Sequence, residues 1–128
     1  MELKIKEGIK GYLEQIVTEK DSASKYGSGM VDVFATPAMV ALIESTAMKS
    51  VLPHLPEGYN TVGIEISVKH LKATPLGMKV WCETSLTKVD GKKLVFNVNA
   101  FDEKGEIGSG THTRYIIETA SFMQNLKG

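Results

Sequence analysis

The sequence predicts an α+β domain in which one long helix is buried against a curved antiparallel sheet. An apolar segment of helical length lies between residues 36 and 51. Segments in which polar and apolar residues alternate follow it up to residue 118, and tight-turn signals separate the last of them. An apolar helix and a one-sided sheet each need a partner for their apolar surface, so we expect them to bury each other.

The chain before the helix is expected to hold one strand and one loop. The strand lies within "GIKGYLEQIVTEK", residues 8–20. The polar, Ser/Gly-rich stretch "DSASKYGSGM", residues 21–30, is typical of a loop, and "VDVF" after it is a short extended piece. This part of the chain therefore leads directly into the helix.

The helix is expected to begin at Thr36 and Pro37, because threonine is a good N-cap and proline fits the first helical turn. It should end near Val51, before "LPHLPEG", which contains two prolines and a glycine. The segment is apolar on nearly all sides, which indicates a buried helix.

A period of two residues follows the helix. It places five residues on one face of the next strand, which should turn towards the helix: Val62, Ile64, Ile66, Val68 and His70. Two further strands show the same alternation, with Met78, Val80, Cys82, Thr84 and Leu86 in one and Leu94, Phe96, Val98 and Ala100 in the other. Turns at "KVDGKK" and "DEKGE" indicate hairpins, "EIGSGTHTRYIIE" is the last strand, and "SFMQNLKG" adds a terminal helical turn.

An antiparallel sheet wrapped around a long central helix is the hot-dog fold, which we expect as one domain over residues 1–128. Most hot-dog domains pair through a sheet edge, giving a homodimer with two sites between subunits. The formal net charge of zero, with 15 basic and 15 acidic residues, favours self-association. It also argues against nucleic acid or an anionic membrane as a partner.

The remaining composition suggests a cytoplasmic protein without a metal. The single cysteine, Cys82, excludes an internal disulfide and suits a reducing compartment. The first ten residues lack the apolar core of a signal peptide, and no apolar run approaches the roughly 18 residues of a membrane span. No His/Asp/Glu cluster has the spacing of metal ligands, so we expect no bound metal. The sequence also lacks the motif of a phosphate-binding glycine loop.

Glu44 is the first candidate for chemistry, because it is the only charged residue between Asp32 and Lys49. Burying an unpaired carboxylate costs several kcal/mol. Glu44 therefore either has structural partners, such as backbone amides or a cation from the sheet, or serves as a general base or nucleophile.

Thr36 and His70 are the next candidates. A structural role as helix cap is sufficient to explain Thr36. The start of the helix also offers free backbone amides, at Ala38 and Met39, which could bind an oxyanion. His70 is either a hydrogen-bonded core histidine or, beside a carboxylate and a hydroxyl, part of a nucleophile, base and orienter set. Thr36 and Glu44 lie about 12 Å apart along a regular helix. A shared site would need substrate between them, a non-helical start, or Glu44 from a second subunit.

Three residues complete the set of candidates. Gly63 lies inside a strand, which suggests a bulge, a close backbone approach or a plain twist of the sheet. Arg114 suits a phosphate or a carboxylate but is equally compatible with the surface. His112 shares a strand face with Arg114 and could line the same site.

Three motifs resemble the fluoroacetyl-coenzyme A thioesterase-like group of hot-dog proteins, over about residues 8–118. They are "ATPAMVALIE", "TVGIEISVKHLKATPLG" and "GSGTHTRYII". The resemblance implies that Thr36, Glu44 and His70 are catalytic. It implies that Gly63 helps to hold the thioester through its amide and that Arg114 lines the site.

The function implied is hydrolysis of a small acyl-CoA thioester at a dimer interface, with coenzyme A as part of the substrate and no other cofactor. The residues of the loop "SASKYGSGM" before the helix give no sign that the site selects for fluorine. Two alternatives remain: a hot-dog hydratase or dehydratase, and a non-catalytic module that binds an acyl thioester or small ligand.

Overall fold

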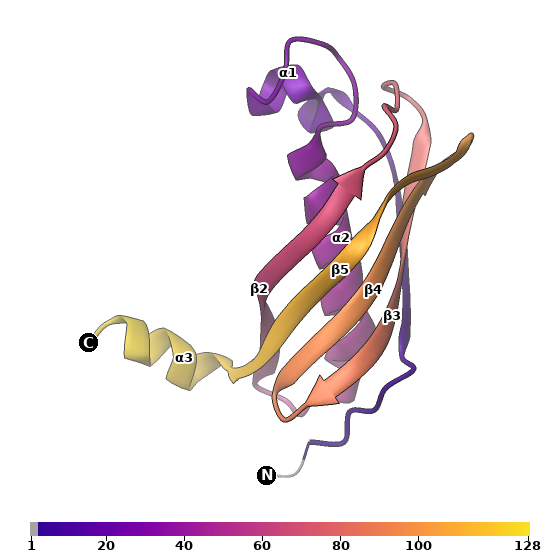
Figure 1. The fold of residues 1–128 in the computed structure, drawn as a ribbon. Coiled ribbons are helices and arrows are strands. Elements are labelled where there is room, and N and C mark those ends of the chain that lie inside the picture. The colour runs from indigo at the N-terminus through magenta and orange to yellow at the C-terminus, as the bar shows by residue number, and fades with distance from the viewer. Residues whose placement is uncertain (1–2) are drawn as a thin grey trace.

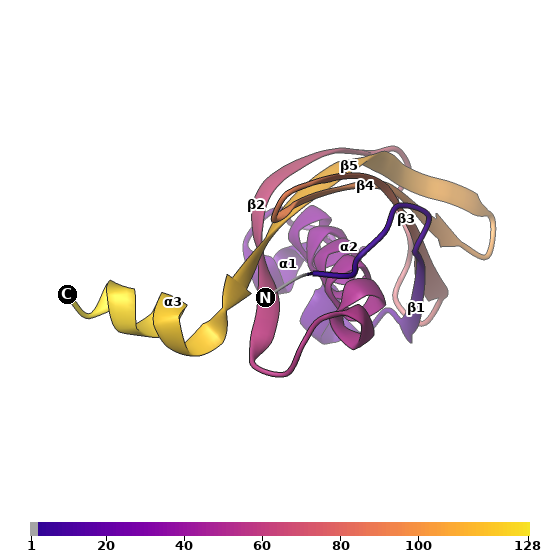
Figure 2. The same cartoon turned by 90° about the horizontal axis from the view of Figure 1, so that it is seen from below.

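The structure, a computed structural model, describes residues 3–128 and shows one antiparallel sheet curved around one long helix (Figures 1 and 2). The sheet has the strand order β1-β3-β4-β5-β2. The main elements are β1 (Lys10–Ile16), α2 (Thr36–Val51), β2 (Tyr59–His70), β3 (Lys79–Asp90), β4 (Lys93–Asp102) and β5 (Gly105–Glu118). This is the expected hot-dog fold, and its two sheet edges are β1 and β2.

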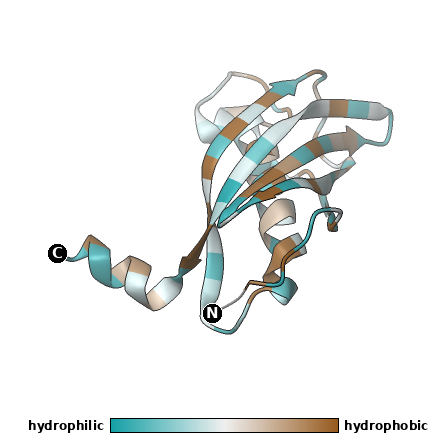
Figure 3. Ribbon diagram, turned by 60° about the horizontal axis from the view of Figure 1, so that its bottom comes forward, coloured by the Kyte–Doolittle hydropathy of each residue, from teal (hydrophilic) through white to brown (hydrophobic). Residues whose placement is uncertain are grey.

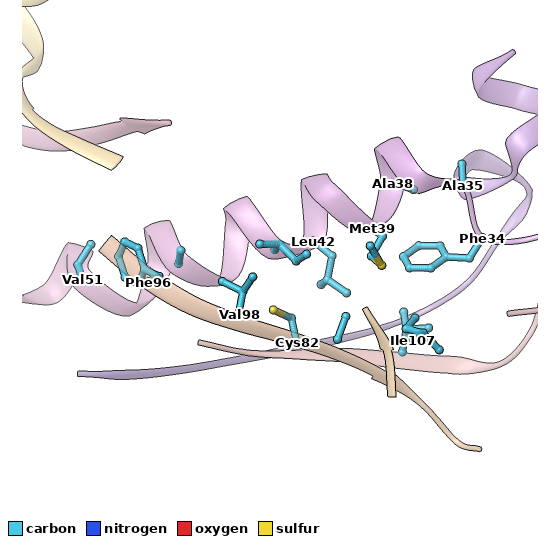
Figure 4. Packing of buried hydrophobic residues seen from close by; sticks show 14 of the residues in the cluster. Phe34, Ala35, Ala38, Met39, Leu42, Val51, Cys82, Phe96, Val98 and Ile107 are labelled. Atoms are coloured by element: carbon cyan, nitrogen blue, oxygen red, sulfur yellow. The ribbon is translucent and has the colours of Figure 1, made fainter. Parts of the chain in front are cut away.

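The core lies between α2 and the concave face of the sheet. The helix residues Met39 and Leu42 face Cys82, Val98 and Ile107 across this interface (Figure 4). The alternation predicted for β3 and β4 is confirmed, because their inward residues are buried and apolar and polar positions alternate along the strands (Figure 3). Burial raises the pKa of the Cys82 thiol to about 11, so this thiol stays protonated and unreactive.

The start of α2 differs from the expectation. The N-cap is Ala35, which has extended backbone angles, and Thr36 is already the first helical residue. A capping side chain belongs to the N-cap residue, and no side chain makes a capping hydrogen bond at the start of α2. The Thr36 hydroxyl is therefore available for a contact outside the helix.

The period-two prediction for β2 is only partly right, because the strand contains a bulge. Gly63 pairs with Arg114 and Glu65 pairs with Thr113, so Ile64 has no cross-strand partner. An extra residue reverses the alternation of faces. Ile66, Val68 and His70 lie on the predicted face towards α2, whereas Val62 and Ile64 do not. Gly63, predicted to face outward, lies on the helix side, as its contacts below show.

Two short helical elements overlap the predicted loop over residues 21–30. They are the 3₁₀ turn η1 (Glu19–Asp21) and the single-turn helix α1 (Ala23–Tyr26), which the Ser22 hydroxyl caps by accepting from the Lys25 amide. The piece after it makes only isolated bridges, Ser22 with Phe34 and Val33 with Pro75. A second 3₁₀ turn, η2 (Leu52–His54), follows α2.

The terminal helical turn is longer than predicted. The helix α3 (Thr119–Leu126) projects away from the sheet and buries none of its residues (Figure 1). Across residues 3–128, no helix has both the length and the apolar character that crossing a membrane requires.

Candidate active site

Thr36 and His70 form a direct pair. Thr36 starts α2 and His70 ends β2, and the Thr36 Oγ1 to His70 Nδ1 distance is 2.8 Å. The Phe34 ring meets the His70 ring edge to face, with centroids 6.5 Å apart. The two sequence-predicted residues therefore lie in hydrogen-bond contact, although 34 positions separate them in the chain.

The His70 ring is held in its neutral form. Burial lowers its pKa below the ordinary histidine value, and the Lys72 backbone opposes this effect more weakly. A neutral ring has one donor and one acceptor nitrogen. Its Nε2 atom is buried and has no hydrogen-bond partner among residues 3–128, so the ring is oriented by its hydrogen bond to Thr36 and by packing against Phe34.

A pocket of about 540 Å³ opens beside this pair. Its wall combines α1 and the segment before α2 with the chain that follows β2. The lining residues include Ala23, Val31, Val33, Phe34, Thr36 and His70. The lining is thus mostly apolar, and Ser28, Lys72, Thr36 and His70 supply its polar side chains. An apolar wall with a few polar groups is typical of a small-molecule site.

Glu44 lies in a second cluster, near the middle of α2. Its carboxylate is 3.8 Å from Nη1 of Arg114, and its side chain is 42% exposed. Glu44 is therefore partly exposed rather than buried, and one of its expected partners, a cation from the sheet, is present as Arg114. Arg114 partners Glu44 from β5, and β2, on that side of the helix, is an edge strand that leaves Glu44 open to solvent.

Gly63 permits this second cluster. A Cβ atom at this position would lie 2.8 Å from Glu44 Oε1 and 3.2 Å from the His112 ring. Any side chain would push the carboxylate away from its place, so the close approach suggested by a glycine inside a strand is confirmed.

Arg114 is held by more partners than the sequence indicated. Its Nε donates to the Thr61 hydroxyl at 2.7 Å, and its Nη2 donates to the Thr61 carbonyl at 2.9 Å. Its Nη1 meets Nε2 of His112 at 3.1 Å. The alternative of a surface arginine is wrong, since Arg114 is buried. Sequence reasoning missed Thr61 and gave little weight to His112; the one available signal was the two-residue spacing of Thr61 and Gly63.

The structure does not join the two clusters within one chain. Thr36 and Glu44 stand about 12 Å apart along α2. Gly63 and His70 stand roughly 20 Å apart along β2. Each chain therefore carries two separate clusters of these residues, which we name the first half-site, with Thr36 and His70, and the second half-site, with Glu44, Gly63 and Arg114.

The amides at the start of α2 are fewer than expected. Pro37 has no N–H, and the Met39 amide donates to the Ala35 carbonyl at 2.9 Å. Met39 is thus already partnered, and of the two expected oxyanion donors only the Ala38 amide remains a candidate.

The chain is similar to thioesterases. A family model described as fluoroacetyl-CoA-specific thioesterase matches residues 17–120. The fluoroacetyl-CoA thioesterase of Streptantibioticus cattleyicolor is 41% identical over 91 residues, which are 71% of this chain and 66% of that protein. The chain thus spans just under two thirds of that relative in the alignment.

Solved structures extend the similarity over nearly the whole chain. A structure of the fluoroacetyl-CoA thioesterase FlK superposes with a TM-score of 0.90 at 31% identity, covering 96% of each chain. A mutant of the same enzyme, in complex with fluoroacetate and CoA, superposes with a TM-score of 0.86 at 32% identity, covering 92% of this chain and 99% of that one.

Proposed function

Because the chain belongs to the fluoroacetyl-CoA-specific thioesterase family, a family of thioester hydrolases, we propose that it hydrolyses a small acyl-CoA thioester to the free acid and coenzyme A. The observation that carries the proposal is the 2.8 Å hydrogen bond between Thr36 and His70 at the edge of the pocket. A neutral imidazole bound to a hydroxyl beside an apolar cavity is suited to acyl transfer.

The Thr36–His70 bond supports two routes, which differ in the tautomer of His70. If Nδ1 accepts the Thr36 proton, Thr36 becomes the nucleophile. If Nδ1 donates to Thr36, the hydroxyl keeps its own proton for the developing oxyanion, and Glu44 attacks the carbonyl carbon or activates water. In every route the C–S bond breaks, water supplies the acid oxygen, and His70 transfers protons to and from the reacting groups.

The second half-site supplies the binding groups in this proposal. The Gly63 backbone approaches the thioester without a side chain in the way, and Arg114 supplies a positive charge next to Glu44. Gly63 on β2 and Arg114 on β5 lie far from the Thr36–His70 pair of the same chain. The proposal therefore needs an arrangement that brings the two half-sites together.

A homodimer through the β2 edge meets this requirement. In an antiparallel pair related by a two-fold axis, residues on either side of the axis face each other. An axis near Ile66 places His70 of one copy opposite the Gly63 region of the other. The edge carries exposed apolar side chains, Ile64, Ile66 and Leu71 among them, which such pairing would cover.

Pairing through β2 predicts that a charged residue introduced on β2 prevents dimerisation, whereas one introduced on β1 does not. Sedimentation at micromolar concentration should show a dimer for the wild type and a monomer for Ile64→Lys on β2. Tyr12→Lys on β1 is the matched control, since Ile64 and Tyr12 are 53% and 55% exposed, and it should stay dimeric. A wild type that sediments only as a monomer contradicts the proposal.

The activity itself is tested by release of free thiol from a panel of acyl-CoA thioesters. We expect coenzyme A and the free acid in equal amounts, with no change in the carbon skeleton of the acyl group. Hydration of an enoyl-CoA without thiol release would point to a hydratase. Saturable binding without any product would point to a binding module.

A further inference from the structure

His112 on β5 has a role in the second half-site that its burial alone does not explain. The residue is 1% exposed, and both ring nitrogens have hydrogen-bond partners. Nδ1 lies 2.8 Å from the Glu65 carbonyl and Nε2 lies 3.1 Å from Nη1 of Arg114. The ring also stacks on Phe96, with centroids 6.3 Å apart and planes at 28°.

These two partners determine where the ring proton is. A carbonyl oxygen can only accept a hydrogen bond and a guanidinium can only donate. Nδ1 must therefore carry the proton and donate to Glu65, while Nε2 presents its lone pair to Arg114. His112 is thus a neutral imidazole of one defined tautomer.

The orientation of Arg114 depends on this lone pair. Thr61 holds Nε and Nη2, as described above, and the remaining nitrogen, Nη1, lies between His112 Nε2 at 3.1 Å and Glu44 Oε1 at 3.8 Å. The Glu44 contact is too long for a good hydrogen bond by itself. Because the guanidinium is rigid and planar, the two Thr61 bonds leave only a rotation about the line from Nε to Nη2, and the His112 contact limits that rotation so that Nη1 lies in front of the carboxylate.

We propose that His112 is a positioning residue for Glu44, acting through Arg114. The neutral ring anchors Nη1, the anchored guanidinium holds the carboxylate beside Gly63, and Glu44 is thereby aimed for its part in thioester hydrolysis. This inference rests on the proposed function, because it assigns His112 to the reaction that Glu44 carries out.

Protonation of His112 would dismantle the arrangement. A charged ring has no lone pair for Arg114 and places a second cation next to the guanidinium. The charged groups that face the ring are Arg114 on β5 and Glu44 on α2; Phe96 on β4 adds none, and the Glu65 carboxylate on β2 turns to the Thr113 hydroxyl at 3.5 Å.

The electrostatics keep the ring neutral near pH 7. Burial is the largest influence and lowers the pKa of His112, and Arg114 lowers it further, while the Glu65 carbonyl and Glu44 oppose the shift. A histidine whose pKa is lowered in the folded state binds its proton more readily when unfolded. It therefore costs stability as the pH falls from about 6.5 through the folded-state pKa, and nothing above that range.

The test compares two substitutions of His112 by steady-state kinetics. His112→Phe keeps an aromatic ring against Phe96 but removes the acceptor for Arg114, so kcat should fall by about 10–100-fold, the range known for outer-shell partners in metal sites, with little change in KM. His112→Gln places an amide oxygen where Nε2 was and should recover much of the loss. A purely structural role predicts the reverse order, because phenylalanine keeps an aromatic ring packed on Phe96 and glutamine does not.

Nuclear magnetic resonance of the ring nitrogens in the wild type gives a readout that does not depend on any variant folding. Near pH 7, Nδ1 of His112 should be protonated and Nε2 should not. A proton on Nε2, or wild-type kcat in His112→Phe, overturns the inference while leaving the proposed function intact. No thiol release by the wild type overturns both.

Discussion

Replacing His70 by alanine should lower kcat by about 10²–10⁴-fold, the range for loss of a general acid or base, with a much smaller change in KM. The ring is neutral, is bonded to Thr36 at 2.8 Å and lies at the edge of the pocket. Its removal takes away the group that moves the proton in either route. It leaves the pocket wall formed by Phe34 and the α1 segment in place, so substrate binding should change little.

The matched control is Lys69→Ala. Lys69 precedes His70 on β2, its side chain is exposed on the opposite face, and its replacement should leave kcat nearly unchanged. Equal effects of the two substitutions on kcat would contradict the catalytic assignment. A rise in KM without a loss of kcat would show that His70 binds substrate and that proton transfer belongs to another group.

Glu44→Gln should remove most of the turnover while leaving the melting temperature close to that of the wild type. The change keeps the shape of the side chain but removes the negative charge needed to attack the carbonyl or to activate water. Because the carboxylate is 42% exposed and 3.8 Å from Arg114, its ion pair contributes little to stability. Activity by thiol release and the melting temperature, measured on the same preparation, separate the two effects.

Glu65→Gln serves as the control for Glu44→Gln. Glu65 is an exposed glutamate on β2, and within residues 3–128 its carboxylate accepts one hydrogen bond, from the Thr113 hydroxyl at 3.5 Å. Its carbonyl, which binds His112, is unchanged by the substitution. We expect near-normal turnover. If Glu44→Gln keeps its activity but melts at a markedly lower temperature, Glu44 is a structural residue and the catalytic role is wrong.

Periodicity along the chain was sufficient to predict the fold. The apolar run at residues 36–51 and the alternation in the strands each depend on neighbours within a few positions, and burial of one apolar face on another leaves few arrangements open. The turns at Gly91 and Gly105 could also be predicted from neighbouring residues alone. Both glycines have a positive φ angle, which favours glycine over other residues.

The site was predictable as a set of residues but only partly as an arrangement. Thr36 and His70 are paired as their types suggested. Gly63, by contrast, was placed on the wrong face, because the period of two was continued through Ile64. Gly63 suggested a bulge as one of three possibilities, and the bulge is present. A bulge is a mismatch between two paired strands, here β2 and β5, so the sequence of β2 alone did not decide among the three.

Long-range contacts decided the rest. Thr61 and His112 surround Arg114 only because β2 and β5 pair in one register, and Glu44 reaches them only because α2 lies against that part of the sheet. The sequence shows that these residues can donate, accept or carry charge. Which donor meets which acceptor depends on residues about 50 positions apart, and that is settled by how the helix packs on the sheet.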